Sequence, residues 1–346
     1  MPSSVAVTLL VVLTLGWLVY IWANLRKARP EVGSEIELAP NRKPYLDDEA
    51  LEGRKLETTQ MLGVVLLVVS AVGLPLYWLN EPGRMEGAIA GYNKRFAGWG
   101  ANDFDVTANG GFNCAGCHGG MKATGGVAPY TITSPTTGEI RAVSWKAPAL
   151  DTVLYRFSED EVRFILVYGR PYSPMSPWGI AGGGPMNDQQ IQNIIEYLKS
   201  IQVPMEGCAE GETICADGRA PKSLTDEIQK DAEALVASGQ AKSMGEALFK
   251  LESASGAYSC ARCHTTGWSY GSAQASGGGA MGPNLTGGST VRQFPSQADM
   301  TTFIAKGSEV GKRYGQQGQG SGRMPGFGQL LTDEQVKAIV EYERSL

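Results

Sequence analysis

Both histidines of this chain directly follow a Cys-x-x-Cys pair. The first motif is "CAGCH" at residues 114–118 and the second is "CARCH" at residues 260–264. The 346 residues contain no third histidine. Every site that needs an imidazole must therefore use His118 or His264, and the fold has to bring two thiols and one imidazole together twice.

This motif is the attachment pattern of c-type haem. Two thiols at this spacing can reach the two vinyl groups of a haem as thioethers, and the adjacent imidazole then becomes the proximal ligand of the iron. We therefore expect two covalently bound haem c groups, one on each of two residue sets: Cys114, Cys117 and His118, and Cys260, Cys263 and His264.

Two other interpretations of the motifs have less support. A zinc ribbon would need the two cysteine pairs to meet, but they are far apart in the sequence and lack the matching knuckle composition. A thioredoxin-like redox pair belongs at the start of a helix in a βαβ unit, a context that the surrounding sequence does not provide. Haem attachment is the strongest functional signal in the sequence.

The segments after each motif repeat one another. After the first motif come "KAPALDTV", "YGRPYSPMSPWG" and "MNDQQIQNIIEYLKSI", and after the second come "GPNLTGG" and "SGRMPGFGQLLTDEQVKAIVEYERSL". Each half thus contains a proline loop, a methionine loop with an aromatic residue, and an amphipathic helix ending in Glu-Tyr. This arrangement resembles the class I cytochrome c fold over residues 84–204 and 240–346.

A six-coordinate haem needs a distal ligand, and with no histidine left methionine is the leading candidate. The resemblance implies Met324 for the second haem, because "RMPGFG" matches the distal loop of the family. For the first haem Met175 and Met186 compete. We favour Met175, which is followed by proline and tryptophan and lies well before the last helix, whereas Met186 adjoins that helix.

The same resemblance assigns a role to two prolines. Pro148 and Pro283 would place their backbone carbonyls where they accept the Nδ1 proton of His118 and His264. Such a bond fixes the tautomer of the imidazole and raises its basicity as a ligand. The alternative role of each proline is simply to form a turn.

Two apolar segments near the N-terminus predict membrane helices. Residues 5–25 and 61–79 contain no charged side chain and are long enough to cross a bilayer. A cleaved signal peptide does not fit residues 5–25, which exceed the usual apolar core and lack a basic start and a small-residue cleavage site. We expect transmembrane helices at 1–25 and 61–80, joined by a loop at 26–60.

The charges predict the orientation of these helices. The loop contains several basic residues, whereas none precedes the first helix; they are Arg26, Lys27, Arg29, Arg42, Lys43, Arg54 and Lys55. The positive-inside rule places this loop in the cytoplasm. Both termini and both haem domains are then expected on the outer, periplasmic or extracellular face of a bacterial cytoplasmic membrane.

Residues 205–239 are expected to link the two cytochrome domains. Cys208 and Cys215 lie there, in a compartment where disulfides persist, and the short loop between them can be closed by a disulfide. The alternative, a cysteine as a distal haem ligand, is weaker. The segment is acidic, which favours a solvated linker, with docking of a basic partner as the other interpretation.

Composition excludes several functions. The net charge of −5 and the absence of a basic run argue against nucleic-acid binding. A copper centre needs several histidine ligands, and a dihaem peroxidase usually contains a haem with two histidine ligands. Two histidines, each already expected to be the proximal ligand of one haem, are too few for either. We therefore expect an electron-transfer subunit that is not catalytic alone. A peroxidase or thiosulfate-type dehydrogenase, and a haem-binding sensor or assembly protein, remain alternatives.

The whole layout, a mainly α chain with a transmembrane hairpin followed by two class I cytochrome c domains, resembles two families of respiratory subunits. The first is the dihaem cytochrome c subunit of bcc-type quinol–cytochrome c reductases, although those carry a C-terminal membrane helix. The second is the dihaem subunit of cbb-type oxidases, which has the same helices-first order. The resemblance implies membrane lipid, cytochrome b, a Rieske protein and a cytochrome oxidase as partners, and we favour the reductase.

Overall fold

The computed structural model describes residues 3–27, 52–134, 137–170, 173–252, 259–309, 311–316 and 324–346; within residues 3–27, side chains are described for 11–23. The chain divides into two units, Met1–Met85 and Glu86–Leu346. The larger unit contains both Cys-x-x-Cys-His motifs. Most of the expected cytoplasmic loop, from residue 28 to residue 51, lies outside the described residues.

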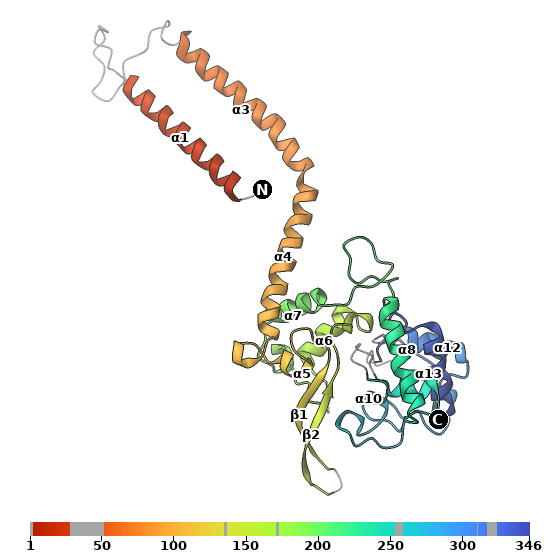
Figure 1. Ribbon diagram of the computed structural model, residues 1–346. Helices are drawn as coiled ribbons and strands as arrows, with labels where there is room; N and C mark the ends of the chain where they lie inside the picture. Colours follow the sequence, from red (N-terminus) through yellow and green to blue (C-terminus); the bar gives the residue numbers. More distant parts are fainter. Residues whose placement is uncertain are drawn as a thin grey trace, which may run out of the picture. The chain divides into compact units, whose positions relative to one another are not determined.

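Two apolar helices account for most of the smaller unit, α1 (Ser3–Lys27) and α3 (Arg54–Leu79) (Figure 1). Among the described residues, α3 alone is long and apolar enough to cross a membrane. It begins at Arg54, before the apolar segment predicted from residue 61, so the polar residues ahead of that segment are helical as well. There, Thr58 and Thr59 donate side-chain hydrogen bonds to the carbonyls of Arg54 and Lys55.

The larger unit begins within α4 and contains two similar sets of elements, which we call the first and second modules. The first module runs to the end of α7. Its elements are α4 (Glu81–Phe104), η1 (Thr107–Asn109), α5 (Cys114–His118), β1 (Gly126–Thr133), β2 (Ile140–Ala147), η2 (Val153–Tyr155), α6 (Glu159–Tyr168), η3 (Ile180–Gly182) and α7 (Asp188–Ser200).

The second module follows α8 (Lys222–Ala237) and runs to the end of the chain. Its elements are α9 (Met244–Lys250), α10 (Ala261–His264), η4 (Trp268–Tyr270), α11 (Ser289–Gln293), α12 (Gln297–Lys306) and α13 (Asp333–Ser345). The last helix of each module begins at a side-chain cap. Asn187 and Thr332 form capping boxes at the starts of α7 and α13, each with a glutamine three residues on.

In both modules a glycine allows the first helix to cross the last one closely. A methyl group at Gly100 of α4 would lie 1.9 Å from the carbonyl oxygen of Asn193 in α7. A methyl group at Gly245 of α9 would lie 2.0 Å from the carbonyl oxygen of Ala338 in α13. Aromatic pairs pack beside each crossing, with ring centroids 5.2 Å apart for Phe104–Tyr197 and 5.3 Å apart for Phe249–Tyr342.

Two elements differ from the sequence-based expectation. A β-hairpin, β1 paired antiparallel with β2 from Gly126–Ala147 to Thr133–Ile140, interrupts the first module after its motif (Figure 1). The segment expected to be a solvated linker contains α8 instead. Its Leu224, Ile228 and Ala232 recur every fourth residue and are buried in the core of the second module, because that spacing places them on one face.

The larger unit has two hydrophobic cores, one for each module. The second core also contains Tyr155 from η2 of the first module, together with Met205 and Ala220 from the segment between the modules. The two modules therefore share packing within one unit.

Candidate functional site

The first Cys-x-x-Cys-His motif forms a helix of little more than one turn. Helix α5 begins after Asn113, whose φ of 68° is left-handed, and ends at Gly119, whose φ is 88°. A methyl group at Gly119 would lie 2.2 Å from the carbonyl oxygen of Gly125, so the exit from the motif requires glycine for both conformation and space. The helix places Cys114 and His118 four residues apart, on one face.

The imidazole of His118 is buried and oriented by the proline loop. Its Nδ1 lies 2.8 Å from the carbonyl oxygen of Pro148. Burial lowers the pKa of His118; the bond to Pro148 opposes this shift, and the positive charge of Arg262 adds to it. A neutral imidazole with Nδ1–H donated to a carbonyl leaves Nε2 free to bind a metal.

The second motif has the same arrangement. Helix α10 is one turn long, and the Nδ1 of His264 lies 2.9 Å from the carbonyl oxygen of Pro283. Burial lowers the pKa of His264 as well. Gly282 packs against the ring, since a methyl group there would lie 2.7 Å from its Cε1.

The motif cysteines lie in apolar surroundings. Burial raises the pKa of Cys114 to about 12 and raises the pKa of Cys260 well above its ordinary value. It also raises the pKa of Cys117. These shifts are opposite to those of reactive cysteines, whose thiolates are stabilised by nearby positive charge.

Met324 lies in a loop fixed at the end of α12. Gly307, with φ of 76°, ends this helix, and a methyl group there would lie 2.6 Å from the carbonyl oxygen of Met324. The N–H of Ser308 donates to that same carbonyl at 2.9 Å. Phe327, three residues after the methionine, donates its N–H to Ile304 at 3.0 Å.

Met175 occupies the matching position in the first module. Gly169, with φ of 69°, ends α6, and a methyl group there would lie 2.5 Å from the carbonyl oxygen of Met175. The N–H of Arg170 donates to that carbonyl at 2.8 Å. Trp178, again three residues after the methionine, donates its N–H to Leu166 at 2.9 Å.

Met186 occupies a different position. It precedes Asn187, the N-cap of α7, and its side chain is 1 % exposed within the first core. Its N–H donates to the carbonyl of Trp178 at 2.7 Å. The residue in this position of the second module is Leu331, which precedes the N-cap Thr332 and is also buried. An apolar residue just before an N-cap commonly packs on the first turns of its helix.

Three charged residues that were not expected from the sequence connect the modules. Arg262, between the cysteines of the second motif, donates a hydrogen bond from Nη1 to the carbonyl oxygen of Lys146, and its Nη2 lies 2.7 Å from Glu252. The Nζ of Lys146 lies 2.7 Å from the other carboxylate oxygen of Glu252. No one-dimensional pattern joins residues 146, 252 and 262, so this group depends on tertiary structure.

A buried carboxyl group was also missed. Glu343 of α13 is 4 % exposed, and burial raises its pKa to about 8. Its negative charge would act on the thiol of Cys260, whose pKa it raises further. In the sequence, Glu343 falls on the apolar face of α13, and a carboxylate at such a position is the pattern that indicates a buried acid.

Cys208 and Cys215 form a disulfide with their Cα atoms 5.6 Å apart. The disulfide loop is attached to the segment that follows Met324. Gln329 donates from Nε2 to the carbonyls of Cys215 at 3.0 Å and Ala216 at 2.8 Å, and Ala220 donates its N–H to the carbonyl of Gln329 at 2.7 Å.

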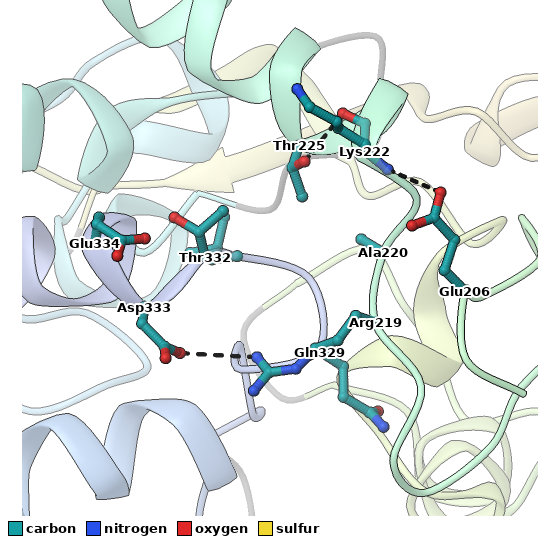
Figure 2. A pocket seen from close by; sticks show the side chains of 10 residues that line it. Glu206, Arg219, Ala220, Lys222, Thr225, Gln329, Thr332, Asp333 and Glu334 are labelled. Atoms are coloured by element: carbon teal, nitrogen blue, oxygen red, sulfur yellow. Dashed lines mark hydrogen bonds and ion pairs between the residues drawn. The ribbon is translucent and has the colours of Figure 1, made fainter.

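A pocket of about 310 Å³ lies where this attachment meets α13 (Figure 2). Arg219 and Asp333 face one another across it at 3.8 Å, and Glu206 accepts a hydrogen bond from the N–H of Lys222 at 3.2 Å. Neither Cys-x-x-Cys-His motif contributes to its lining. The pocket belongs to the attachment and not to the Cys-x-x-Cys-His motifs.

The residues present fit haem c. Each motif offers two thiols and a buried neutral imidazole, and a methionine loop is fixed in each module. Among the described residues, no three His, Cys, Asp or Glu side chains are grouped to hold a metal ion by themselves. Two buried polar atoms without a hydrogen-bond partner in the described chain, Trp268 Nε1 and Ser269 Oγ, lie a few residues after the second motif and can bond to a polar cofactor edge.

Comparison with known proteins identifies the second module. The family model of cytochrome c oxidase, cbb3-type, subunit III matches residues 245–342. No curated protein and no solved structure matches the chain. Residues 245–342 are therefore a c-type cytochrome domain, which implies covalently bound haem c and a role in electron transfer.

Proposed function

We propose that this chain is a membrane-tethered dihaem cytochrome c, with one haem c in each module, that passes electrons from a quinol-oxidising complex to a terminal oxidase. The observation that carries the proposal is the correspondence between the modules. The family match covers only the second module. The first module has the same histidine–proline bond and the same glycine-capped helix before a methionine.

In this proposal each haem is held by its motif. Cys114 and Cys117 would attach the first haem and His118 would bind its iron; Cys260, Cys263 and His264 would do the same for the second. The haem groups would supply reversible one-electron transfer. Pro148 and Pro283 hold the imidazoles in one tautomer, and the buried surroundings of both rings exclude water from them.

Met175 and Met324 are the proposed distal ligands. The support for Met175 is its position relative to Gly169, Arg170 and Trp178, which matches that of Met324 relative to Gly307, Ser308 and Phe327. Met186 corresponds to Leu331, a residue that cannot bind iron. Methionine–histidine ligation raises the reduction potential of a haem, which suits the oxidising end of a respiratory chain.

The proposed anchor is the helix pair α1 and α3. Both are apolar, and nearly all the side chains described on them are exposed in the isolated chain. The basic residues between them support a cytoplasmic loop, with both haem modules on the outer face of the membrane. This is the compartment in which the Cys208–Cys215 disulfide persists.

Two complexes are candidates for the partner. A bcc-type quinol–cytochrome c reductase would supply cytochrome b and a Rieske protein next to this chain. The electron-entry subunit of a cbb-type oxidase is the second candidate, and the family match of residues 245–342 favours it. In both cases the chain is a carrier within an oxidoreductase complex and does not catalyse alone.

The test is a redox titration of the purified membrane protein, followed by optical absorbance, with Met175→Ala and Met186→Ala variants alongside. We expect two low-spin, high-potential waves, one of which is lost in Met175→Ala and kept in Met186→Ala. A haem that is high-spin and binds cyanide or peroxide in the unmodified protein would contradict the carrier function and favour a peroxidase. The subunits that co-purify in mild detergent separate the two complexes.

A further inference from the structure

The two modules meet along the side of the hairpin. Trp145 of β2 packs against Tyr270 of η4 with ring centroids 5.3 Å apart. Arg141 of β2 donates to the hydroxyl of Ser272 at 2.8 Å, and the ammonium of Lys146 lies 5.4 Å from the ring centroid of Trp268. Strand β2 leads directly into the loop that carries Pro148, whose carbonyl accepts the hydrogen bond from His118. The contacts of β2 therefore connect this loop to the second module.

Arg262 is the buried charge at this junction. Its side chain is 9 % exposed, and its two terminal nitrogens bond to the Lys146 carbonyl and to the Glu252 carboxylate. Lys146 is two residues before Pro148, whose carbonyl accepts from His118. On the other side of Pro148, Arg156 donates to the carbonyl of Ala149 at 3.1 Å. The loop is thus held by an arginine on each side of Pro148, one of them from the other module.

Haem attachment itself does not require an arginine at this position. The residue between the cysteines of the first motif, directly before Cys117, is Gly116. A buried guanidinium is costly unless it is paired and hydrogen-bonded. The chain provides both here, through a carboxylate and a carbonyl that belong to different segments. Such an arrangement points to a role at the junction.

We propose that Arg262 is a positioning residue for the first haem site, although it lies in the second motif. It holds the loop that orients His118 and places a positive charge beside that loop. This inference rests on the proposed dihaem function. The charged side chains that face Arg262 are Glu252, which neutralises it in part, and Lys146, so the group Arg262–Glu252–Lys146 keeps a net positive charge.

The positive charge of Arg262 should shift the reduction potential of the first haem in a defined direction. A haem carries one more positive charge when oxidised than when reduced, so a nearby cation disfavours the oxidised form and raises the reduction potential. Removing the charge of Arg262 should lower the potential of the first haem, and removing the charge of Glu252 should raise it. Loss of packing alone would not give opposite signs.

The experiment is spectroelectrochemical titration of the full-length protein in detergent. The variants are Arg262→Gln, Arg262→Lys and Glu252→Gln, and a Met324→His variant identifies the wave of the second haem. The matched control is Arg141→Gln, which removes a cation from the same junction at an exposed position. We expect the redox wave of the first haem to move to lower potential in Arg262→Gln and to move less in Arg262→Lys. It should move to higher potential in Glu252→Gln and keep its position in Arg141→Gln.

The inference is overturned if the first wave stays in Arg262→Gln, or if Arg262→Gln and Glu252→Gln move it in the same direction. Haem content, measured as the pyridine complex against protein mass, is determined first for every sample. A protein that holds one haem or none refutes the proposed function instead. A variant that keeps two haems but shows no shift refutes only the role of Arg262.

Discussion

Ser308 and Met324 form a reciprocal pair of hydrogen bonds. The backbone N–H of Ser308 donates to the carbonyl of Met324 at 2.9 Å, and the N–H of Met324 donates to the hydroxyl of Ser308 at 3.1 Å. The pair closes the loop that presents the methionine, directly after the glycine that ends α12. The position of this proposed ligand thus depends on one buried hydroxyl group.

Ser308→Ala should loosen this loop. The substitution leaves the partly buried N–H of Met324 without its acceptor, at a cost of about 1 kcal/mol. We expect the methionine–iron absorbance band of the second haem to be lost at a lower temperature than in the unmodified protein. Ser296→Ala is the control, because Ser296 caps α12 without contacting the methionine loop. Equal loss of the band in both variants would show that the hydroxyl acts only through the helix.

Gly100→Ala should destabilise the first module. The added methyl group would lie 1.9 Å from the carbonyl oxygen of Asn193, so α4 and α7 must separate. Overpacking of this kind costs about 1–3 kcal/mol or more. The measurement is thermal unfolding of the two-haem protein. Gly91→Ala lies in the same helix with nothing within 4 Å of the new methyl group, and should be neutral or stabilising.

Removing the disulfide with Cys208→Ser and Cys215→Ser should weaken the attachment to the second module. Closing a loop this short contributes about 2–3 kcal/mol in the chain-entropy account. The carbonyls of Cys215 and Ala216 bond to Gln329, so we expect faster hydrogen exchange at residues 328–331 together with the lower stability. Gln329→Ala should accelerate the same exchange while leaving the disulfide intact. Unchanged exchange in the double variant would contradict the coupling.

Glu343 should make stability depend on pH. Burial raises its pKa from 4.5 to about 8 in the folded chain, so between these values the folded state binds more protons than the unfolded state. Stability therefore falls as pH rises from about 5 to 8, by an amount on the order of a few kcal/mol. Denaturant titrations at several pH values should show this slope, and Glu343→Gln should remove it. Glu341→Gln, exposed on the same helix, should keep it.

The attachment motifs and the helix that ends each module were predictable because each depends on a short sequence pattern. The histidine–proline pairing was expected only from the resemblance to class I cytochrome c, and the structure contains both bonds. The hairpin was missed although its signal is present. Alternating residues in "GVAPYTIT" and "IRAVSWKA" flank a Ser-Pro and Thr-Gly turn sequence, which is typical of a strand pair. The acidic residues of 205–239 concealed α8, whose apolar residues recur every fourth position on one face only.

The junction between the modules could not be predicted from the sequence. Arg262 occupies a variable position of its motif, and its partners Lys146 and Glu252 come from distant segments. A buried ion pair depends on which backbone segments pack together, and local propensity carries no information about that. Met175 as the distal ligand stays a prediction, which the two folded loops support by relating Met186 to Leu331.

The hairpin also changes the length of chain that must be ordered to orient the first imidazole. His118 and its acceptor Pro148 are 30 residues apart, compared with 19 for His264 and Pro283. Because Gly126 pairs with Ala147 at the base of the hairpin, the strands bridge most of this distance, and only short segments remain on either side. Residues added at the hairpin turn therefore do not lengthen the path from His118 to Pro148. The turn between β1 and β2 is a place where related chains can differ in length without disturbing iron ligation.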